Sequence, residues 1–410
     1  MTFLSDQTTK IQNTFSEYPR QFWVVTFGLM FSSAGSSMIW PFQLIYISKV
    51  LALPISSAAT LISLSSLAGL VASLLGGAIA DHFGRKWIMF TAQAANALAY
   101  ILMSQASTYA SFVVPMAILG AAMPFYAVGS DAMMADMIPT KKLSGAYAIL
   151  RMFNNAGIAI GPAIGGFIVT KSYTTAFYIA AAAMLAFSLL LLTSVRETLK
   201  RTDRHVESPI IESLAGFVQV AANTSFMAFV TTIAIGMIAP LMMWTLLAVY
   251  MNRYFAIPEY LYSWLPITNA LMCVFAQYPV TLFTNRLRTK SAIALGMFVY
   301  ALGVGSVAIM NNLPGFWFSM VLMSMGELIL APTGSKYVAE IAPQELRGRY
   351  MSVYWLTWGL ARSLAPMAGG YLHDSIAPVA IWWGGLIIGM LSAFILYLLS
   401  RQPIVLPKKA

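Results

Sequence analysis

Five ionisable side chains stand well inside long apolar runs of this sequence. A charge in hydrocarbon costs several kcal/mol unless it is paired or reaches water, so such residues are candidates for binding protons, ions or charged ligands. Glu327 lies thirteen residues after Pro314 and sixteen before Pro343. At roughly 1.5 Å per helical residue, it stands about 20 Å from the Pro314 end. The five residues are Asp131, Arg151, Glu327, Lys336 and Arg362.

A carboxylate and a cation at similar depth suggest proton coupling. Glu327 and Arg362 stand in consecutive apolar runs. A neighbouring cation favours the charged form of a carboxyl, so release of Arg362 could decide when Glu327 takes up a proton. A permanent structural ion pair is the alternative, and we favour coupling, with Asp131 as a third candidate. Asp131 and the nearly equivalent Lys336 could form a ring with Arg151, and there we favour a structural salt-bridge network or a cytoplasmic gate over substrate contact.

Other polar and aromatic residues recur at helical spacing and indicate a water-accessible cavity for substrate. Amide and guanidinium groups can hydrogen-bond a ligand, and tryptophan rings can stack on one. For any single tryptophan, ordinary packing is the alternative. The candidate cavity residues are Trp40, Gln43, Arg151, Asn154, Asn155, Asn269, Gln277, Trp355 and Trp358.

Composition places these residues in a membrane protein. Of the 410 residues, 59% are hydrophobic and only 9% are charged, whereas soluble domains carry about a quarter charged residues. Apolar runs of eighteen or more residues recur, long enough to cross a bilayer core of roughly 30 Å. The polar first twenty residues lack the layout of a cleavable signal peptide, so we expect the N-terminus to be retained. The single cysteine, Cys273, excludes an internal disulfide, and we expect no metal site and no cofactor.

Polar, Gly and Pro punctuation predicts an all-α fold of twelve transmembrane helices in two six-helix bundles. The predicted domains are an N-terminal bundle over 1–195, a cytoplasmic linker over 196–212 and a C-terminal bundle over 213–410. The predicted spans are 22–47, 56–80, 87–106, 110–135, 143–170, 174–196, 224–252, 259–284, 290–311, 315–341, 347–371 and 376–400.

The distribution of basic residues predicts the orientation. Of 24 Lys and Arg, 18 fall at the termini, in the even-numbered loops or at the span ends that border these loops. Cytoplasmic loops carry such an excess, so we expect both termini on the cytoplasmic side of the inner membrane. The net charge of +10 then reflects topology, and no nucleic-acid partner is expected.

The two halves repeat at a constant offset. DMIP at 136–139 recurs as EIAP at 340–343, and GPAIGG at 161–166 recurs as APMAGG at 365–370; both pairs are 204 residues apart. The same offset carries Asp81 onto Asn285, in a second basic hairpin. Parallel repeats of this kind are typical of transporters in which two bundles rock about a central site.

Two glycine-containing motifs stand in the first half. The hairpin between spans two and three holds Gly77, Asp81, Gly84, Arg85 and Lys86. Its glycines permit close helix approach and a tight turn, and its cations suit an anionic leaflet. Asp136, at the inner end of span four, is the candidate partner of Arg85. A charge cluster that only sets topology is the alternative.

The second motif runs along span five. Its glycines line one face of the helix and permit close packing, and its proline removes a backbone hydrogen bond. Simple helix packing and a specific role in antiport remain open as interpretations. The motif residues are Gly157, Gly161, Pro162, Gly165 and Gly166.

These motifs, the helix number and the repeat resemble the major facilitator superfamily, and the span-five motif resembles its twelve-helix drug–proton antiporter branch. The resemblance implies that Asp81 and Arg85 belong to a latch that holds the outward-facing state. The Gly-Glu stretch around Glu327 is similar to an acidic helix-ten motif of some multidrug and peptide members. Span four lacks the Arg that the antiporter branch usually carries.

We therefore expect a monomeric secondary transporter that exports a small amphipathic or drug-like compound by alternating access, driven by protons. Transport of an anionic metabolite, sugar, peptide or lipid headgroup is the alternative, followed by a transporter-like sensor. An enzyme is not expected, because the sequence has no P-loop, HExxH or GxSxG motif.

Overall fold

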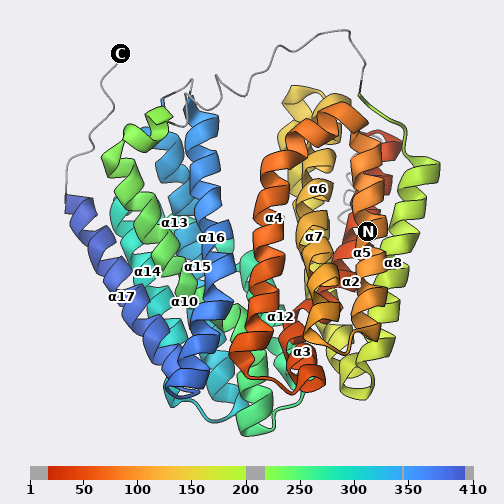
Figure 1. The fold of residues 1–410 in the computed structure, drawn as a ribbon. Helices are drawn as coiled ribbons and strands as arrows, with labels where there is room; N and C mark the ends of the chain where they lie inside the picture. Colours follow the sequence, from red (N-terminus) through yellow and green to blue (C-terminus); the bar gives the residue numbers. More distant parts are fainter. Residues whose placement is uncertain (1–16, 200–217, 344–345, 402–410) are drawn as a thin grey trace, which may run out of the picture. The chain divides into compact units, whose positions relative to one another are not determined.

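The described part of the chain is built of helices. A computed structural model describes residues 17–199, 218–343 and 346–401, and within these residues it contains helices and no strand (Figure 1). An apolar chain in hydrocarbon must satisfy its backbone N–H and C=O groups internally, and a helix does so within one segment. The expected all-α fold is confirmed.

A helix occupies each of the twelve predicted spans. In the first half these are α2 (Arg20–Ile39) with η1 (Trp40–Phe42) and α3 (Gln43–Leu51), α4 (Ile55–Phe83), α5 (Arg85–Gln105), α6 (Tyr109–Met137), α7 (Thr140–Lys171) and α8 (Tyr173–Ser194). In the second half they are α10 (Thr224–Phe255), α11 (Glu259–Tyr262) with α12 (Trp264–Phe275) and α13 (Gln277–Thr284), α14 (Thr289–Ser306) with η2 (Val307–Ile309), α15 (Leu313–Ile341), α16 (Arg347–Ser375) and α17 (Ala380–Arg401).

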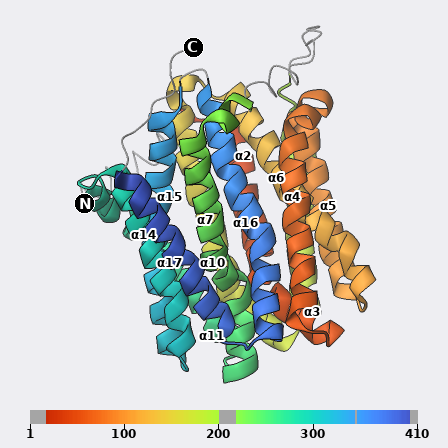
Figure 2. The same ribbon diagram turned by 60° about the vertical axis from the view of Figure 1, so that its left-hand side comes forward.

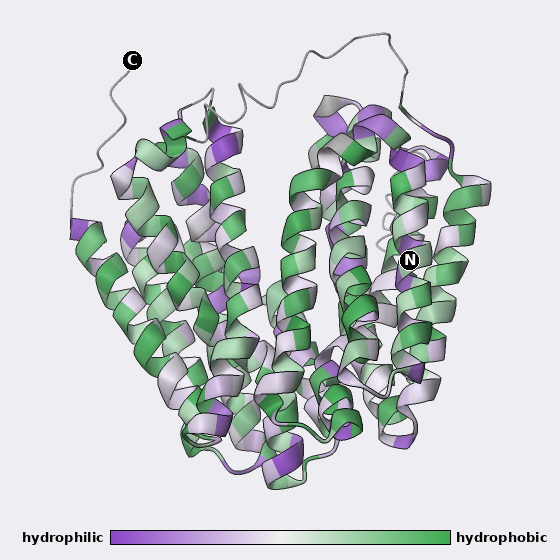
Figure 3. Cartoon of the chain, in the orientation of Figure 1, coloured by the Kyte–Doolittle hydropathy of each residue, from purple (hydrophilic) through white to green (hydrophobic). Residues whose placement is uncertain are grey.

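Length and apolarity qualify fewer than twelve of these helices as membrane spans. Within the described residues nine qualify, and a tenth is added if α12 and α13, bent by 59° at their junction, count as one broken span. The helices α5 and α16 are outside this set, although they are 21 and 29 residues long. Polar residues gather mainly toward helix ends, and apolar residues cover the middle of the helices (Figure 3). The chain is thus a multi-pass membrane protein.

Contacts divide the chain into two compact units. Unit 1 comprises Met1–Trp40 and Ala68–Thr202, and unit 2 comprises Pro41–Leu67 and Asp203–Ala410. The first part of α4 therefore belongs to unit 2 and its remainder to unit 1. The predicted domain boundary at 196–212 stays a prediction, because most of that linker lies outside the described residues.

Within each unit, long helices pack in pairs. In unit 1, α2 packs against α7 and α8, and α5 packs against α6 and α8. In unit 2, α14 packs against α15 and α17, while α10 packs against α16 and α17; Figures 1 and 2 show α14 and α17 side by side. Buried apolar side chains such as Phe22, Met89 and Met133 form the core of unit 1. The packed helices of each unit thereby fix the positions of the polar side chains that they carry.

Candidate functional site

The turn between α4 and α5 requires glycine. Gly84 has a φ of +103°, a conformation that L side chains rarely adopt. A Cβ at this position would also collide with the carboxyl group of Glu197. At Gly77, by contrast, no described atom lies within 4 Å of the position a Cβ would take. The close approach that the sequence suggested for both glycines therefore occurs only at Gly84.

Arg85 stands between two carboxylates of unit 1. Its Nη2 lies 3.0 Å from Oδ1 of Asp81, one turn earlier, and its Nε lies 3.3 Å from Oδ2 of Asp136 at the end of α6. The Arg85 side chain is 13% exposed and that of Asp81 is 72% exposed. Because an exposed pair is screened by water, the more buried contact with Asp136 is the stronger link between the helices.

Glu197, which follows α8, caps the first turn of α5. Its Oε1 accepts from the backbone N–H of Arg85 at 3.0 Å, and its Oε2 accepts from that of Lys86 at 3.1 Å. The first N–H groups of a helix have no intrahelical acceptor, and a carboxylate there also meets the positive end of the helix dipole. Sequence reasoning missed Glu197, since it was counted only as the start of the linker. An acidic residue directly after an apolar span was the available signal.

Neighbouring residues fix this segment to two more helices. The side chain of Gln21 on α2 exchanges hydrogen bonds with the backbone of Arg196, at 2.9 and 3.1 Å. The hydroxyl of Thr198 donates to Oδ2 of Asp136 at 2.9 Å, so Asp136 serves both Thr198 and Arg85. We call residues 196–198 with Arg85 and Asp136 the hairpin clamp. The clamp joins the ends of α2, α5, α6 and α8.

The glycine motif of α7 packs directly against α2. A Cβ on Gly157, Gly161 or Gly165 would collide with backbone or side-chain atoms of residues 30–38. The hydroxyl of Ser37 donates to the carbonyl of Gly157 at 3.2 Å. This geometry accounts for the motif by close packing within unit 1, with Pro162 and Gly166 also buried in α7.

Polar residues of α7 divide between packing and exposed positions. Asn154 accepts a 2.5 Å hydrogen bond from the hydroxyl of Ser33 on α2. Asn155 is half-buried, whereas Arg151 is exposed. Of the three polar candidates on α7, Arg151 is thus the exposed one.

Glu327 is half-buried on α15 and has an amide neighbour. Nδ2 of Asn269, on α12, donates to Oε2 of Glu327 at 2.9 Å and lies 2.9 Å from the hydroxyl of buried Ser324. An amide N–H donor stabilises a carboxylate, and an amide cannot itself supply the proton that a carboxylate takes up. The structure therefore joins two sequence candidates, Glu327 and Asn269, and adds Ser324.

A proline explains the next contact along α15. Pro332 has no N–H, so the carbonyl of Leu328, four residues earlier, lacks its usual helical donor. Nε2 of Gln277 donates to this carbonyl at 3.1 Å and also lies 3.1 Å from the hydroxyl of Thr281. Gln277 begins α13, directly after the 59° bend. The bend thus brings Gln277 to the backbone beside Glu327.

The other cavity candidates differ in exposure. On α16, Arg362 and Trp355 are exposed, and the rings of Trp355 and Trp358 lie 5.8 Å apart. Trp40 is 41% exposed, while Gln43 is buried. The predicted pairing of Arg362 with Glu327 stays a prediction.

Asp131 and Lys336 stand in different units. The side chain of Asp131 is exposed, and the hydroxyl of Tyr147 donates to its backbone carbonyl at 3.1 Å. Lys336 lies 3.4 Å from Oδ1 of Asn285 and 3.9 Å from the carboxylate of Glu340. Contacts within each unit thus account for both surroundings, and a joint network stays a prediction.

At the opposite end of unit 2, a buried histidine takes part in a hydrogen-bond chain. His373 Nε2 lies 2.7 Å from the hydroxyl of Tyr254, and Nδ1 lies 2.6 Å from Asp374. The other carboxylate oxygen of Asp374 accepts from the backbone N–H of Ser56, in the first turn of α4, at 2.7 Å. Nearby, Lys49 pairs with buried Glu259 at 3.1 Å. These contacts attach α3 and α4 to α10, α11 and α16, and the sequence did not reveal them.

Asp374 lies beyond the predicted apolar span 347–371. Burial opposes the charged form of its carboxyl, but hydrogen bonds from Ser56 and His373 outweigh this effect and hold its pKa below the ordinary value. The hydrogen bonds to Asp374 therefore favour its ionised form.

Known proteins resemble the chain over nearly its whole length. The family model described as Major Facilitator Superfamily matches residues 25–254 and 224–410. A Na(+), Li(+), K(+)/H(+) antiporter of Planococcus maritimus is 23% identical over 87% of this chain and 88% of the relative. The multidrug resistance protein MdtH of Proteus mirabilis is 22% identical over 80% of this chain and 81% of the relative.

A solved transporter shares the fold. The crystal structure of the nucleoside transporter NupG superposes with a TM-score of 0.79, covering 94% of this chain and 100% of the other. The identity is 14%, so the likeness concerns the fold alone.

We expect Gly84→Ala to destabilise unit 1, because the new Cβ meets Glu197 and the backbone would be held at a positive φ. The cost is about 1 kcal/mol or more, visible as a lower melting temperature of the purified protein. Gly77→Ala is the matched control, since open space surrounds that position. Equal melting temperatures for the two variants would contradict the clamp geometry.

We expect Tyr254→Phe and Asp374→Asn each to reduce the free energy of unfolding at neutral pH by about 1 kcal/mol, which is measured as a lower melting temperature. Tyr371→Phe should have no effect, because Tyr371 is an exposed tyrosine of α16, the helix that carries Asp374. Because the pKa of Asp374 is lowered in the folded state, its contribution is present above the ordinary carboxyl pKa of about 4 and is lost as the pH falls through the lowered pKa. The difference between wild type and Asp374→Asn should therefore shrink on acidification; a constant difference would argue against an ionic role.

Proposed function

The chain belongs to the Major Facilitator Superfamily and is a membrane transporter, and on this basis we propose that it exports a small amphipathic compound in exchange for protons. The observation that carries the proposal is Glu327, an ionisable side chain within the apolar helix α15 that is held by Asn269. A carboxylate in such a position is expected to serve transport rather than folding, since its burial costs free energy.

Proton uptake at Glu327 would change its contact with Asn269. The carboxylate accepts the amide N–H, whereas a protonated carboxyl also becomes a donor and accepts more weakly. We propose that this change, with Arg362 and Asp131 as further coupling residues, biases the exchange between two arrangements of the helices. The antiporter and multidrug names among the relatives support exchange and efflux.

The hairpin clamp supplies the conformational latch in this scheme. Arg85 bridges Asp81 and Asp136, and Glu197 attaches the segment after α8 to the same turn. We propose that this end faces the cytoplasm, with both termini, in the inner membrane, as the distribution of Lys and Arg favours. We also propose that the transporter acts as a monomer.

A second candidate function is transport of an anionic compound. Arg151 and Arg362 are both exposed within helices of the membrane region, and guanidinium groups bind carboxylates and phosphates in a bidentate manner. The half-buried carboxylate of Glu327 and the aromatic rings of Trp355 and Trp358 favour a cationic or amphipathic compound instead.

We expect Glu327→Gln to reduce pH-gradient-driven flux by at least about tenfold, because the amide cannot exchange a proton. The measurement uses the purified full-length protein in liposomes with imposed pH gradients and a panel of cationic, neutral and anionic compounds. The same assay without a gradient reports whether substrate exchange survives.

Glu340→Gln is the matched control, since Glu340 is exposed near the end of the same helix and lies 3.9 Å from Lys336. It should leave the flux unchanged. If no compound shows gradient-dependent flux, or if Glu327→Gln behaves like wild type, proton coupling at Glu327 is wrong. Gradient-driven flux of anions alone would favour the second candidate.

A further inference from the structure

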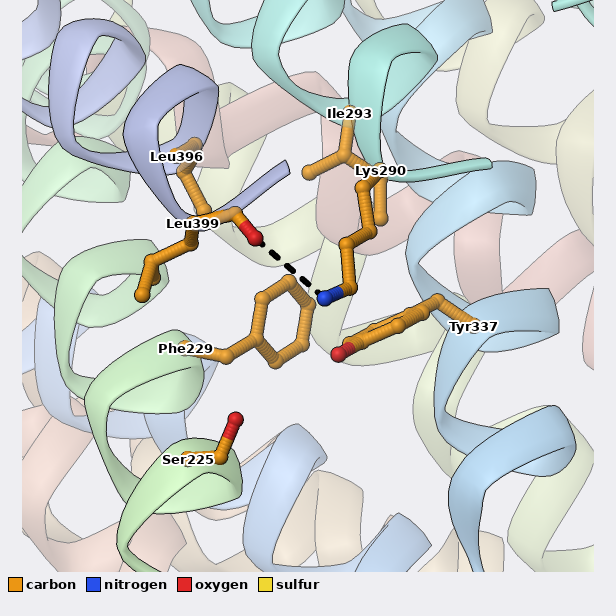
Figure 4. A pocket seen from close by; sticks show the side chains of 7 residues that line it. All are labelled: Ser225, Phe229, Lys290, Ile293, Tyr337, Leu396 and Leu399. Atoms are coloured by element: carbon orange, nitrogen blue, oxygen red, sulfur yellow. Dashed lines mark hydrogen bonds between the residues drawn. The ribbon is translucent and has the colours of Figure 1, made fainter. Parts of the chain in front are cut away.

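A hollow lies among four helices at the end of unit 2 where α10 and α14 begin (Figure 4). Three polar side chains contribute to its wall: Ser225 of α10, Lys290 of α14 and Tyr337 of α15. Apolar side chains of α10, α14 and α17 complete it. Among the described residues that line it, none is acidic.

Lys290 stands where a cation is ordinarily disfavoured. It is the second residue of α14, at the positive end of the helix dipole. Its side chain reaches across the hollow, and Nζ donates to the carbonyl of Leu399 at 3.2 Å, near the carbonyl end of α17 (Figure 4). The ammonium also lies 5.9 Å from the ring centroid of Tyr337. The charge is thereby held over the hollow by two other helices.

The size of the hollow restricts what can enter. Its empty volume is about 290 Å³, part of which is open to the surroundings. Pockets that enclose a whole small molecule measure about 300–1,000 Å³. The hollow therefore suits one polar end of a larger group that remains mostly outside.

The charges around the hollow favour an anionic oxygen. Arg286 and Arg288 precede α14, and Arg401 ends α17 two residues after Leu399. An acid, Glu340, also stands on α15, one turn beyond Tyr337, and it lies 3.9 Å from Lys336. Phosphate oxygens are strong acceptors for ammonium and guanidinium groups.

The outer face of α17 suits acyl chains. Leu391, Ile395 and Leu398 are spaced by four and three residues and are 36–55% exposed. This spacing forms one apolar stripe along the helix, and the stripe lies next to the helix face that carries Leu399. A lipid that lay along the stripe would bring its headgroup to the level of Lys290.

We propose that the hollow binds the phosphate group of an anionic phospholipid from the leaflet at that end of the helices. One phosphate oxygen contacts Lys290 beside the hydroxyls of Ser225 and Tyr337, and the acyl chains lie on the stripe of α17. This site goes beyond the proposed transport function, and its occupancy can be measured without any transport assay.

The test is a titration of the purified, delipidated full-length protein with phosphatidylglycerol, followed by native mass spectrometry and by melting temperature. We expect saturable binding that raises the melting temperature. Lys290→Gln should weaken the binding by about tenfold, and Lys290→Arg should retain most of it. Lys336→Gln is the matched control, because it removes a lysine of the same unit and the same end without touching the hollow.

Each other outcome overturns part or all of the proposal. Equal binding by wild type and Lys290→Gln excludes the hollow as the site. Equal affinity for phosphatidylcholine excludes selection for an anionic lipid. Stabilisation by inorganic phosphate alone, to the same extent, indicates a free-anion site instead of a lipid site. If Lys290→Gln fails to fold, the comparison of Ser225→Ala with wild type decides by the same titration.

Discussion

The hydrogen-bonding needs of the backbone are the constraint on which the rest of this structure depends. Within hydrocarbon each N–H and C=O must find a partner in the protein, so the apolar segments become helices. Helix ends and prolines interrupt this pattern, and several notable polar side chains stand at those interruptions. Glu197 accepts from the start of α5, Gln277 donates to the carbonyl left by Pro332, and Lys290 donates near the end of α17. These three side chains therefore stand where the helices leave backbone groups unsatisfied, whereas Asn269 and Glu327 contact each other within the helices.

Much of the fold could be predicted because its determinants are local. Apolar length and polar punctuation predicted a helix at every span, and the glycine spacing in 157–166 predicted the close face of α7. Asp81, Arg85 and Asp136 could be grouped because all three stand at helix ends on one side. The number of twelve transmembrane helices followed less directly from composition. The helix α16 carries Arg362 and two further arginines in its first turn, so its length of 29 residues indicates a span more clearly than its apolarity does.

The missed contacts join residues that are far apart in sequence and carry no local pattern. Glu197 reaches a turn 112 residues earlier, and Asp374 accepts from Ser56, 318 residues away. A single sequence indicates the capping need of each helix but not which distant side chain meets it. At Gly77 the motif suggested close packing, but the structure has open space there, because the sequence does not indicate which distant segment lies opposite a glycine. The grouping of the first part of α4 with unit 2 likewise depends on contacts between residues far apart in the sequence.

Pro332 has a mechanical consequence for α15. A helix resists bending through its ladder of hydrogen bonds, and α15 lacks the rung between residues 328 and 332. A side chain, Gln277, stands in for that rung, and a side-chain bond can stretch or exchange partners where a backbone rung cannot. Glu327 thus stands five residues before a proline that removes one backbone hydrogen bond from its own helix. A change in the contacts of its carboxyl would therefore act close to a point where α15 bends more easily.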